Sequence, residues 1–64
     1  MQIGDNVRRF RKKKGITQEE LAEQINVGRT MVVRIETGTK VPPLLIAAKI
    51  ADVLGCTVDD LLRG

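Results

Sequence analysis

Residues 29–38, R-T-M-V-V-R-I-E-T-G, hold the side chains of this chain that are best suited to recognise a ligand. On a helix that turns about 100° per residue, Val32 and Ile35 share one side and Val33 falls on the opposite side. That opposite side also carries the polar residues Arg29, Thr30, Arg34 and Thr37. Arginine can donate two hydrogen bonds to guanine in a DNA major groove, and Val or the Thr methyl group packs on the thymine methyl group. The outward Val33 is therefore either a groove contact or an isolated surface valine.

Other kinds of chemistry are limited by the residue types that the chain lacks. The sequence contains no His, Ser, Tyr or Trp, and Cys56 is its single cysteine. A zinc site needs several Cys or His ligands, and a nucleophilic pair needs a base such as His beside a Ser or Cys. We therefore predict no metal site, no cofactor, no disulfide and no enzymatic activity, and we interpret Cys56 as a packing residue.

The composition fits one small globular domain that spans residues 1–64. The chain has 64 residues, of which 42% are hydrophobic and 30% charged, values typical of a folded domain. No apolar run approaches the roughly 18 residues of a membrane span, and no signal peptide opens the chain. We therefore expect a cytoplasmic protein with no membrane partner and no small-molecule substrate.

Helix signals divide the chain into five segments. Ile3, Val7 and Phe10 follow a helical spacing that Gly15 ends, and T-x-x-E at 17–20 is a capping box that opens a second helix. Asn26, which tolerates a left-handed backbone, begins the turn that ends the second helix, and T-x-x-D at 57–60 is a second cap before the last helix. Together with similar signals they predict helices near 3–14, 18–25, 29–37, 44–54 and 58–64. No strand pattern, internal repeat or linker occurs. The predicted fold is all-α, a compact five-helix domain.

Basic residues are concentrated at the end of the first predicted helix. The net charge is +3, which by itself is a weak pointer to nucleic acid. Six of the eleven basic residues fall within seven positions: Arg8, Arg9, Arg11, Lys12, Lys13 and Lys14. Considered alone, this run is either a solvated helix face or part of a nucleic-acid-binding surface.

The segment 18–37 has the layout of a helix-turn-helix unit: one helix, a short turn at 26–28, and a second helix that enters a groove. The motifs T-Q-E-E-L-A, R-I-E-x-G and K-I-A-D-V-L-G-C-T-V-D-D-L-L extend this likeness. With them the chain resembles the Xre-like family, the DNA-binding domain of Cro and lambda-type repressors, from about Ile3 to Leu62. The resemblance implies a lambda-repressor-like fold whose third helix reads DNA.

The resemblance also implies roles for individual residues. The base-contacting positions of the third helix are Arg29, Thr30, Val33 and Arg34. The phosphate-contacting positions are Thr17, Gln18, Thr37, Thr39 and Lys40. A structural ion pair is implied between Arg11 and Glu36, and the other basic residues of the first helix would contribute a long-range field without sequence information.

The fourth predicted helix carries more apolar residues than one buried face requires. Leu45 and Ile46 lie within about 60° of its polar side, where relatives commonly have a polar residue at position 45. Because relatives bind DNA as two-fold dimers, these two residues are candidates for a dimer contact; burial against the chain's own loop is the alternative. The apolar excess also leaves open an engineered version of a natural domain.

The function that this resemblance implies is sequence-specific binding of double-stranded DNA, by a transcriptional regulator that represses by occupying its operator at the bacterial nucleoid. A homodimer on DNA is the expected assembly. One alternative is a protein-interaction or antitoxin-like module in which Val33, Leu45 and Ile46 contact protein. A second is a nonspecific architectural DNA binder, for which affinity would depend strongly on salt but little on sequence.

Overall fold

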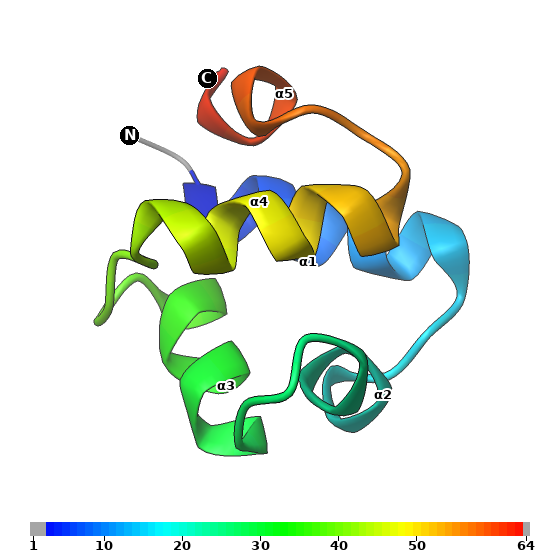
Figure 1. Ribbon diagram of the computed structural model, residues 1–64, viewed down its shortest axis with the longest axis vertical. Helices are drawn as coiled ribbons and strands as arrows, with labels where there is room; N and C mark the ends of the chain where they lie inside the picture. The colour runs from blue at the N-terminus through cyan, green and yellow to red at the C-terminus, as the bar shows by residue number, and fades with distance from the viewer. Residues whose placement is uncertain (1–2, 64) are drawn as a thin grey trace.

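Five helices account for most of the chain in the computed structural model, which describes residues 3–63 (Figure 1). They are α1 (Ile3–Lys14), α2 (Gln18–Gln24), α3 (Arg29–Thr37), α4 (Leu44–Leu54) and α5 (Val58–Leu62). The predicted all-α fold and the order of its five helices are confirmed. The fifth helix ends at Leu62, and Gly64 of its predicted segment lies outside the described residues.

Two capping boxes set where α2 and α5 begin. The Thr17 hydroxyl accepts a hydrogen bond from the Glu20 backbone N–H at 3.0 Å, and the Glu20 carboxylate accepts one from the Thr17 N–H at 2.8 Å. Thr57 and Asp60 repeat this arrangement at α5, with both distances 3.0 Å. Each box satisfies two backbone N–H groups that a helix start leaves without partners. Both boxes were predicted from the sequence and are present.

The turn between α2 and α3 depends on one left-handed residue. Asn26 has φ 61°, a conformation that Asn adopts more readily than most non-glycine residues. Gly28 then caps α3 with φ −75° and ψ 153° and has no side chain to accept the free N–H groups. The turn fixes the angle between α2 and α3, and so decides which face of α3 is outward.

Side chains from all five helices fill one core. The most deeply buried include Val7 of α1, Leu21 of α2, Ile35 of α3, Ile50 of α4 and Leu61 of α5. In Figure 1, α4 crosses in front of α1, with α2 and α3 on one side of this pair and α5 on the other. Every helix therefore covers the same core from a different direction. No helix among residues 3–63 is long and apolar enough to cross a membrane.

Two buried residues of α1 join it to α3 and α5. A Cβ atom on Gly4 would clash with the carbonyl oxygen of Ile35, so glycine permits the close approach of α1 and α3. The Asn6 side chain is 2% exposed, and its Nδ2 donates to the carbonyl oxygen of Leu61 at 2.8 Å and to that of Arg63. These contacts hold the start of α1 against both neighbours.

Candidate nucleic-acid interface

The outward face of α3 carries the predicted base-contacting side chains. Arg29, Thr30 and Arg34 are exposed, whereas Val32 and Ile35 on the opposite face are each 1% exposed. Neither arginine forms an ion pair within residues 3–63, so both guanidinium groups are available to a ligand. The helix therefore presents hydrogen-bond donors around an apolar centre.

Val33 was expected to be an exposed valine on this outward face, but the structure shows it half-buried. Its neighbours at i−4, i−3 and i+4 are Arg29, Thr30 and Thr37, and residues at these spacings lie beside one another on a helix. These polar residues therefore border Val33 along the helix. Val33 is thus a partly exposed apolar side chain with exposed polar residues around it.

Arg11 and Glu36 connect α1 to the last turn of α3. Arg11 Nε donates to Glu36 Oε2 at 2.7 Å and Arg11 Nη2 donates to Glu36 Oε1 at 3.1 Å. Their side chains are 11% and 3% exposed, and Arg11 Nη1 also donates to the carbonyl oxygen of Ile16 at 2.8 Å. The ion pair implied by the resemblance is present, with the two-point geometry that arginine allows.

Gln18 joins the same carboxylate from α2. Its Nε2 donates to Glu36 Oε1 at 3.2 Å, so side chains of three helices meet at Glu36. The sequence reasoning placed Gln18 near phosphate and missed this bond. The bond restricts the Gln18 side chain and leaves its second amide hydrogen and its carbonyl oxygen for other partners.

One carbonyl group organises the segment that follows α3. The carbonyl oxygen of Arg34 lies within hydrogen-bonding distance of the hydroxyl groups of Thr37 and Thr39, both at 3.2 Å. It also accepts from the backbone N–H of Thr39 at 3.0 Å and of Lys40 at 3.2 Å. Gly38 makes this sharp turn possible with φ 85°. The three predicted phosphate-contacting residues at the end of α3 are thereby gathered around a single atom.

A hollow opens where α1, α2 and the end of α3 meet, and we call it the interhelical hollow. Its volume is about 270 Å³, and it is lined by Arg8, Arg11, Lys12, Gln18, Glu36 and Thr37. Gln18 and Thr37 were predicted to contact phosphate, whereas Arg8 and Lys12 were assigned only a long-range field. The structure brings the two groups of residues together.

The family profile described as helix-turn-helix matches residues 7–61. The chain belongs to this family. An uncharacterised HTH-type transcriptional regulator of Archaeoglobus fulgidus is 46% identical over 55 residues, which cover 86% of this chain and 79% of that protein. The predicted resemblance is confirmed.

Solved structures of helix-turn-helix regulators superpose closely. The N-terminal DNA-binding domain of SinR from Bacillus subtilis has a TM-score of 0.90 and 32% identity, over 97% of this chain and 91% of that one. SinR in complex with DNA gives 0.89 and 32%, over 95% and 98%. The clp gene regulator ClgR from Corynebacterium glutamicum gives 0.89 and 35%, over 94% of this chain and 64% of ClgR. The helix-turn-helix chain is thus a domain of DNA-binding transcriptional regulators and not an enzyme.

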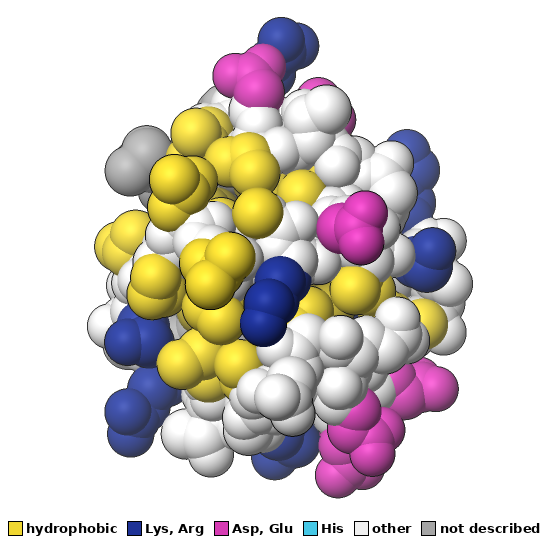
Figure 2. All heavy atoms as spheres, viewed as in Figure 1, with side chains coloured by type: hydrophobic (Ala, Val, Ile, Leu, Met, Phe, Trp, Pro, Cys, Tyr) yellow, Lys and Arg dark blue, Asp and Glu magenta, His cyan; other side chains and the backbone are white. Residues whose placement is uncertain are grey.

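A second surface of the domain is apolar. Val41, Leu44 and Leu45 are 67%, 77% and 68% exposed, and we call these three residues the α4 patch. Figure 2 shows apolar side chains gathered over the first half of α4 and the loop before it. The structure places Ile46 differently from the helical-wheel expectation, because it is half-buried and packs against the core. The wheel missed Leu44 and Val41, whose exposure depends on the path of the loop.

Cys56 is partly buried beside the core, as its interpretation as a packing residue requires. Burial raises the pKa of the Cys56 thiol, and the negative charge of Asp60 raises it further. The thiolate is the reactive form of cysteine, so these two effects keep the group unreactive near neutral pH.

Proposed function

We propose that this helix-turn-helix domain binds double-stranded DNA sequence-specifically by placing α3 in the major groove. In this proposal Arg29 and Arg34 donate to guanines, and Thr30 and Val33 contact thymine methyl groups. The observation that carries the proposal is the outward face of α3, where exposed arginines without ion-pair partners among residues 3–63 surround a half-buried valine. An ordinary solvated helix face does not need this combination.

The backbone contacts in this proposal come from the two ends of the recognition unit. At one end Thr17 and Gln18 begin α2, and at the other Thr37, Thr39 and Lys40 surround the Arg34 carbonyl group. Such contacts fix the register of a protein on the duplex without reading its sequence. They would hold α3 at one depth in the groove, so that its few outward side chains meet defined bases.

The biological role in this proposal is that of a transcriptional regulator in the cytoplasm, at the nucleoid, that represses by occupying its operator. Occupying a site requires only affinity and specificity, which the face of α3 and its flanking contacts supply. No further chemistry is needed from the chain.

We further propose that the domain binds DNA as a homodimer through the α4 patch. The patch contains three large side chains that are each at least 67% exposed, and contiguous exposed apolar surface is typical of an interaction site. In this proposal Leu45, Leu44 and Val41 make the contact, whereas Ile46 is half-buried and packs against the core. Two-fold pairing would present two copies of α3 to a palindromic site.

Selection from a randomised double-stranded DNA library at near-physiological salt tests base reading, with Arg34→Ala measured beside the parent. We expect a motif containing G and T, and a loss of about 1–3 kcal/mol that is confined to one G in the variant. Arg9→Ala is the control, because Arg9 is exposed on α1, and its loss should leave the selected motif unchanged. If no motif emerges and Arg34→Ala binds like the parent, α3 does not read bases, and a protein-facing role for it gains support.

Sedimentation velocity, with and without the selected duplex, tests the dimer. Leu45→Glu should give a monomer on a half-site, whereas Leu62→Glu, at a position that is 41% exposed on α5, should behave like the parent. A palindromic motif bound by two chains would support the dimer. A single half-site bound by one parent chain would contradict it.

A further inference from the structure

The interhelical hollow combines positive charge with enough room for a small anionic group. Three of its six lining residues are cations, Arg8, Arg11 and Lys12, and one is an anion, Glu36. A water molecule occupies about 30 Å³ of liquid, so the hollow of about 270 Å³ has room for a phosphate group together with part of what the phosphate is attached to. The size and the charge of the hollow therefore both suit a phosphate group.

The charge of Glu36 does not cancel the cations at the mouth of the hollow. Both of its carboxylate oxygens accept from Arg11, and Oε1 accepts from Gln18 as well. Arg8 and Lys12 are exposed, and neither forms an ion pair within residues 3–63. At a spacing of four residues they lie side by side on α1. Two uncompensated positive charges therefore remain beside the hollow.

We propose that the interhelical hollow is a phosphate-binding site in which Arg8 and Lys12 pair directly with the phosphate oxygens. Gln18 and Thr37 border the same hollow, and Gln18, held by Glu36, offers its second amide hydrogen at a defined position. This inference rests on the proposed DNA-binding function where the phosphate belongs to the DNA backbone. A free phosphorylated ligand would offer the same chemistry.

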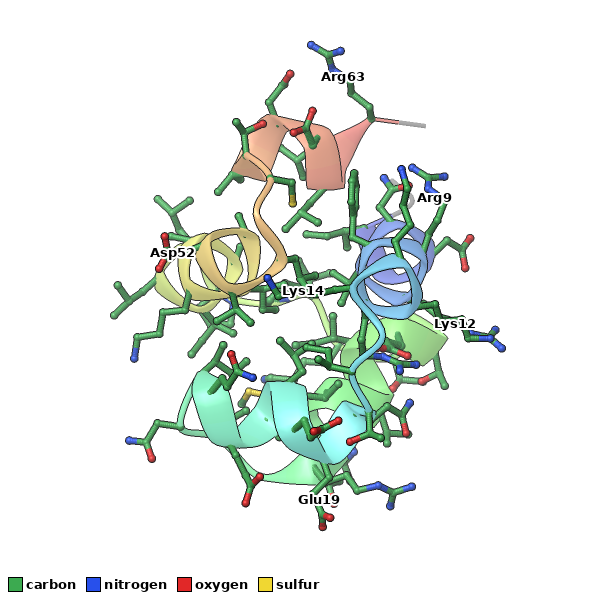
Figure 3. All side chains as sticks on the ribbon, turned by 90° about the vertical axis from the view of Figure 1, so that its right-hand side faces the viewer. Arg9, Lys12, Lys14, Glu19, Asp52 and Arg63 are labelled. Carbon is green, nitrogen blue, oxygen red and sulfur yellow. The ribbon has the colours of Figure 1, made fainter. Side chains whose placement is uncertain are left out.

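The other basic residues of α1 allow a phosphate-binding site to be distinguished from a long-range electrostatic field. In Figure 3, Arg9 and Lys14 leave α1 in directions different from that of Lys12, and neither lines the hollow. Arg9 instead lies over the Phe10 ring, with its guanidinium carbon 5.5 Å from the ring centroid. If these cations acted only through a long-range field, each would contribute about equally to binding. A phosphate site would instead depend on Arg8 and Lys12 and not on Arg9 or Lys14.

The experiment compares Arg8→Gln/Lys12→Gln with the matched control Arg9→Gln/Lys14→Gln, which removes the same two charges from the same helix. The affinity of each for a duplex is measured between about 50 and 200 mM salt. Each phosphate contact contributes about 0.9 to the salt slope, which is about threefold in affinity across this range. We expect the slope of the hollow variant to fall by about 1 and that of the control to stay near the parent value. Thermal melting verifies that both variants fold.

Titration of the parent and both variants with inorganic pyrophosphate, followed by the backbone amide signals of Gln18 and Thr37 in NMR spectra, distinguishes the two sources of phosphate. A slope loss confined to the hollow variant supports the DNA backbone. Equal slopes, with pyrophosphate shifting these signals in the parent and the control alone, support a free phosphorylated ligand. Equal slopes without shifts overturn the proposal. The salt slopes are also measured on duplexes of arbitrary sequence. They therefore test the phosphate site even if the library selection shows that α3 does not read bases.

Discussion

Arg11 and Glu36 form a two-point ion pair, Nε to Oε2 at 2.7 Å and Nη2 to Oε1 at 3.1 Å, between α1 and the last turn of α3. Gln18 adds a bond from α2 to the same carboxylate at 3.2 Å. The end of α3 is thus fixed to α1 and to α2. The backbone and base contacts of the proposed interface share this one buried support.

Glu36→Ala should destabilise the domain strongly, because it leaves the buried Arg11 guanidinium without its partner. Breaking a buried pair from one side costs about 3–5 kcal/mol, a large fraction of the stability of a small domain. Urea denaturation followed by circular dichroism measures the loss. Replacing both residues, as in Arg11→Met/Glu36→Leu, should recover most of it, since no unpaired charge then remains.

The exposed pair between Arg63 and Asp59 is the control for that experiment. Its Nη2 to Oδ2 distance is also 2.7 Å, but the side chains are 73% and 67% exposed. Solvent screens such pairs, and they contribute about 0–1 kcal/mol. Asp59→Ala should therefore change the free energy of unfolding little. Equal losses in Asp59→Ala and Glu36→Ala would mean that burial does not set the strength of these pairs.

The sequence was sufficient to predict features that depend on neighbouring residues. Thr17 and Thr57 marked two helix starts because a capping box is completed within four residues. Asn26 marked the turn because its own backbone has to adopt a left-handed conformation. The spacing of Val32 and Ile35 identified the buried face of α3. Each of these signals is local, so it can be recognised without knowing how the helices pack.

Features that depend on which helices cross were not predicted from residue spacing; the Arg11–Glu36 pair between α1 and α3 was expected only from the family resemblance. In the sequence Gly4 looks like an ordinary helix residue, and its role is visible only once α3 is packed against it. Asn6 looks like a surface residue, although in the structure it is bonded to α5. The position of Arg8 and Lys12 beside Gln18 likewise requires the angle between α1 and α2. Sequence spacing specifies the face of one helix but not the partner of that face.

Gly4→Ala should destabilise the domain although alanine is the better helix former. The added methyl group would clash with the Ile35 carbonyl oxygen, which is backbone and cannot rotate away. Overpacking of this kind costs about 1–3 kcal/mol, measured by the shift of the urea midpoint. Gly28→Ser is the control, because a Cβ atom there meets nothing within 4 Å, and it should stabilise the start of α3 by a few tenths of a kcal/mol. A stabilised Gly4→Ala variant would show that α1 and α3 are not in such close contact.

The capping box of α5 should make stability depend on pH. Hydrogen bonds from the backbone and side chain of Thr57 lower the pKa of Asp60 in the folded state. A group of this kind contributes stability above its unfolded pKa, about 3.9 for Asp, and the contribution is lost as the pH falls through the folded pKa. The difference in unfolding free energy between the parent and Asp60→Asn should therefore be present near neutral pH and shrink in acid. Parallel stability curves down to about pH 2 would contradict a charged cap.

Asn6→Ala should loosen the end of the chain more than the rest of the domain. It removes the donor that holds the carbonyl groups of Leu61 and Arg63 to α1, and leaving a buried acceptor unpaired costs about 1–3 kcal/mol. Hydrogen exchange should accelerate most at the backbone amides of α5, while those of α2 and α3 change only with global stability. Asn6→Asp should cost more, because it places a carboxylate against the same carbonyl oxygens. Uniform acceleration across all helices in both variants would show that Asn6 supports the whole core and not the attachment of α5.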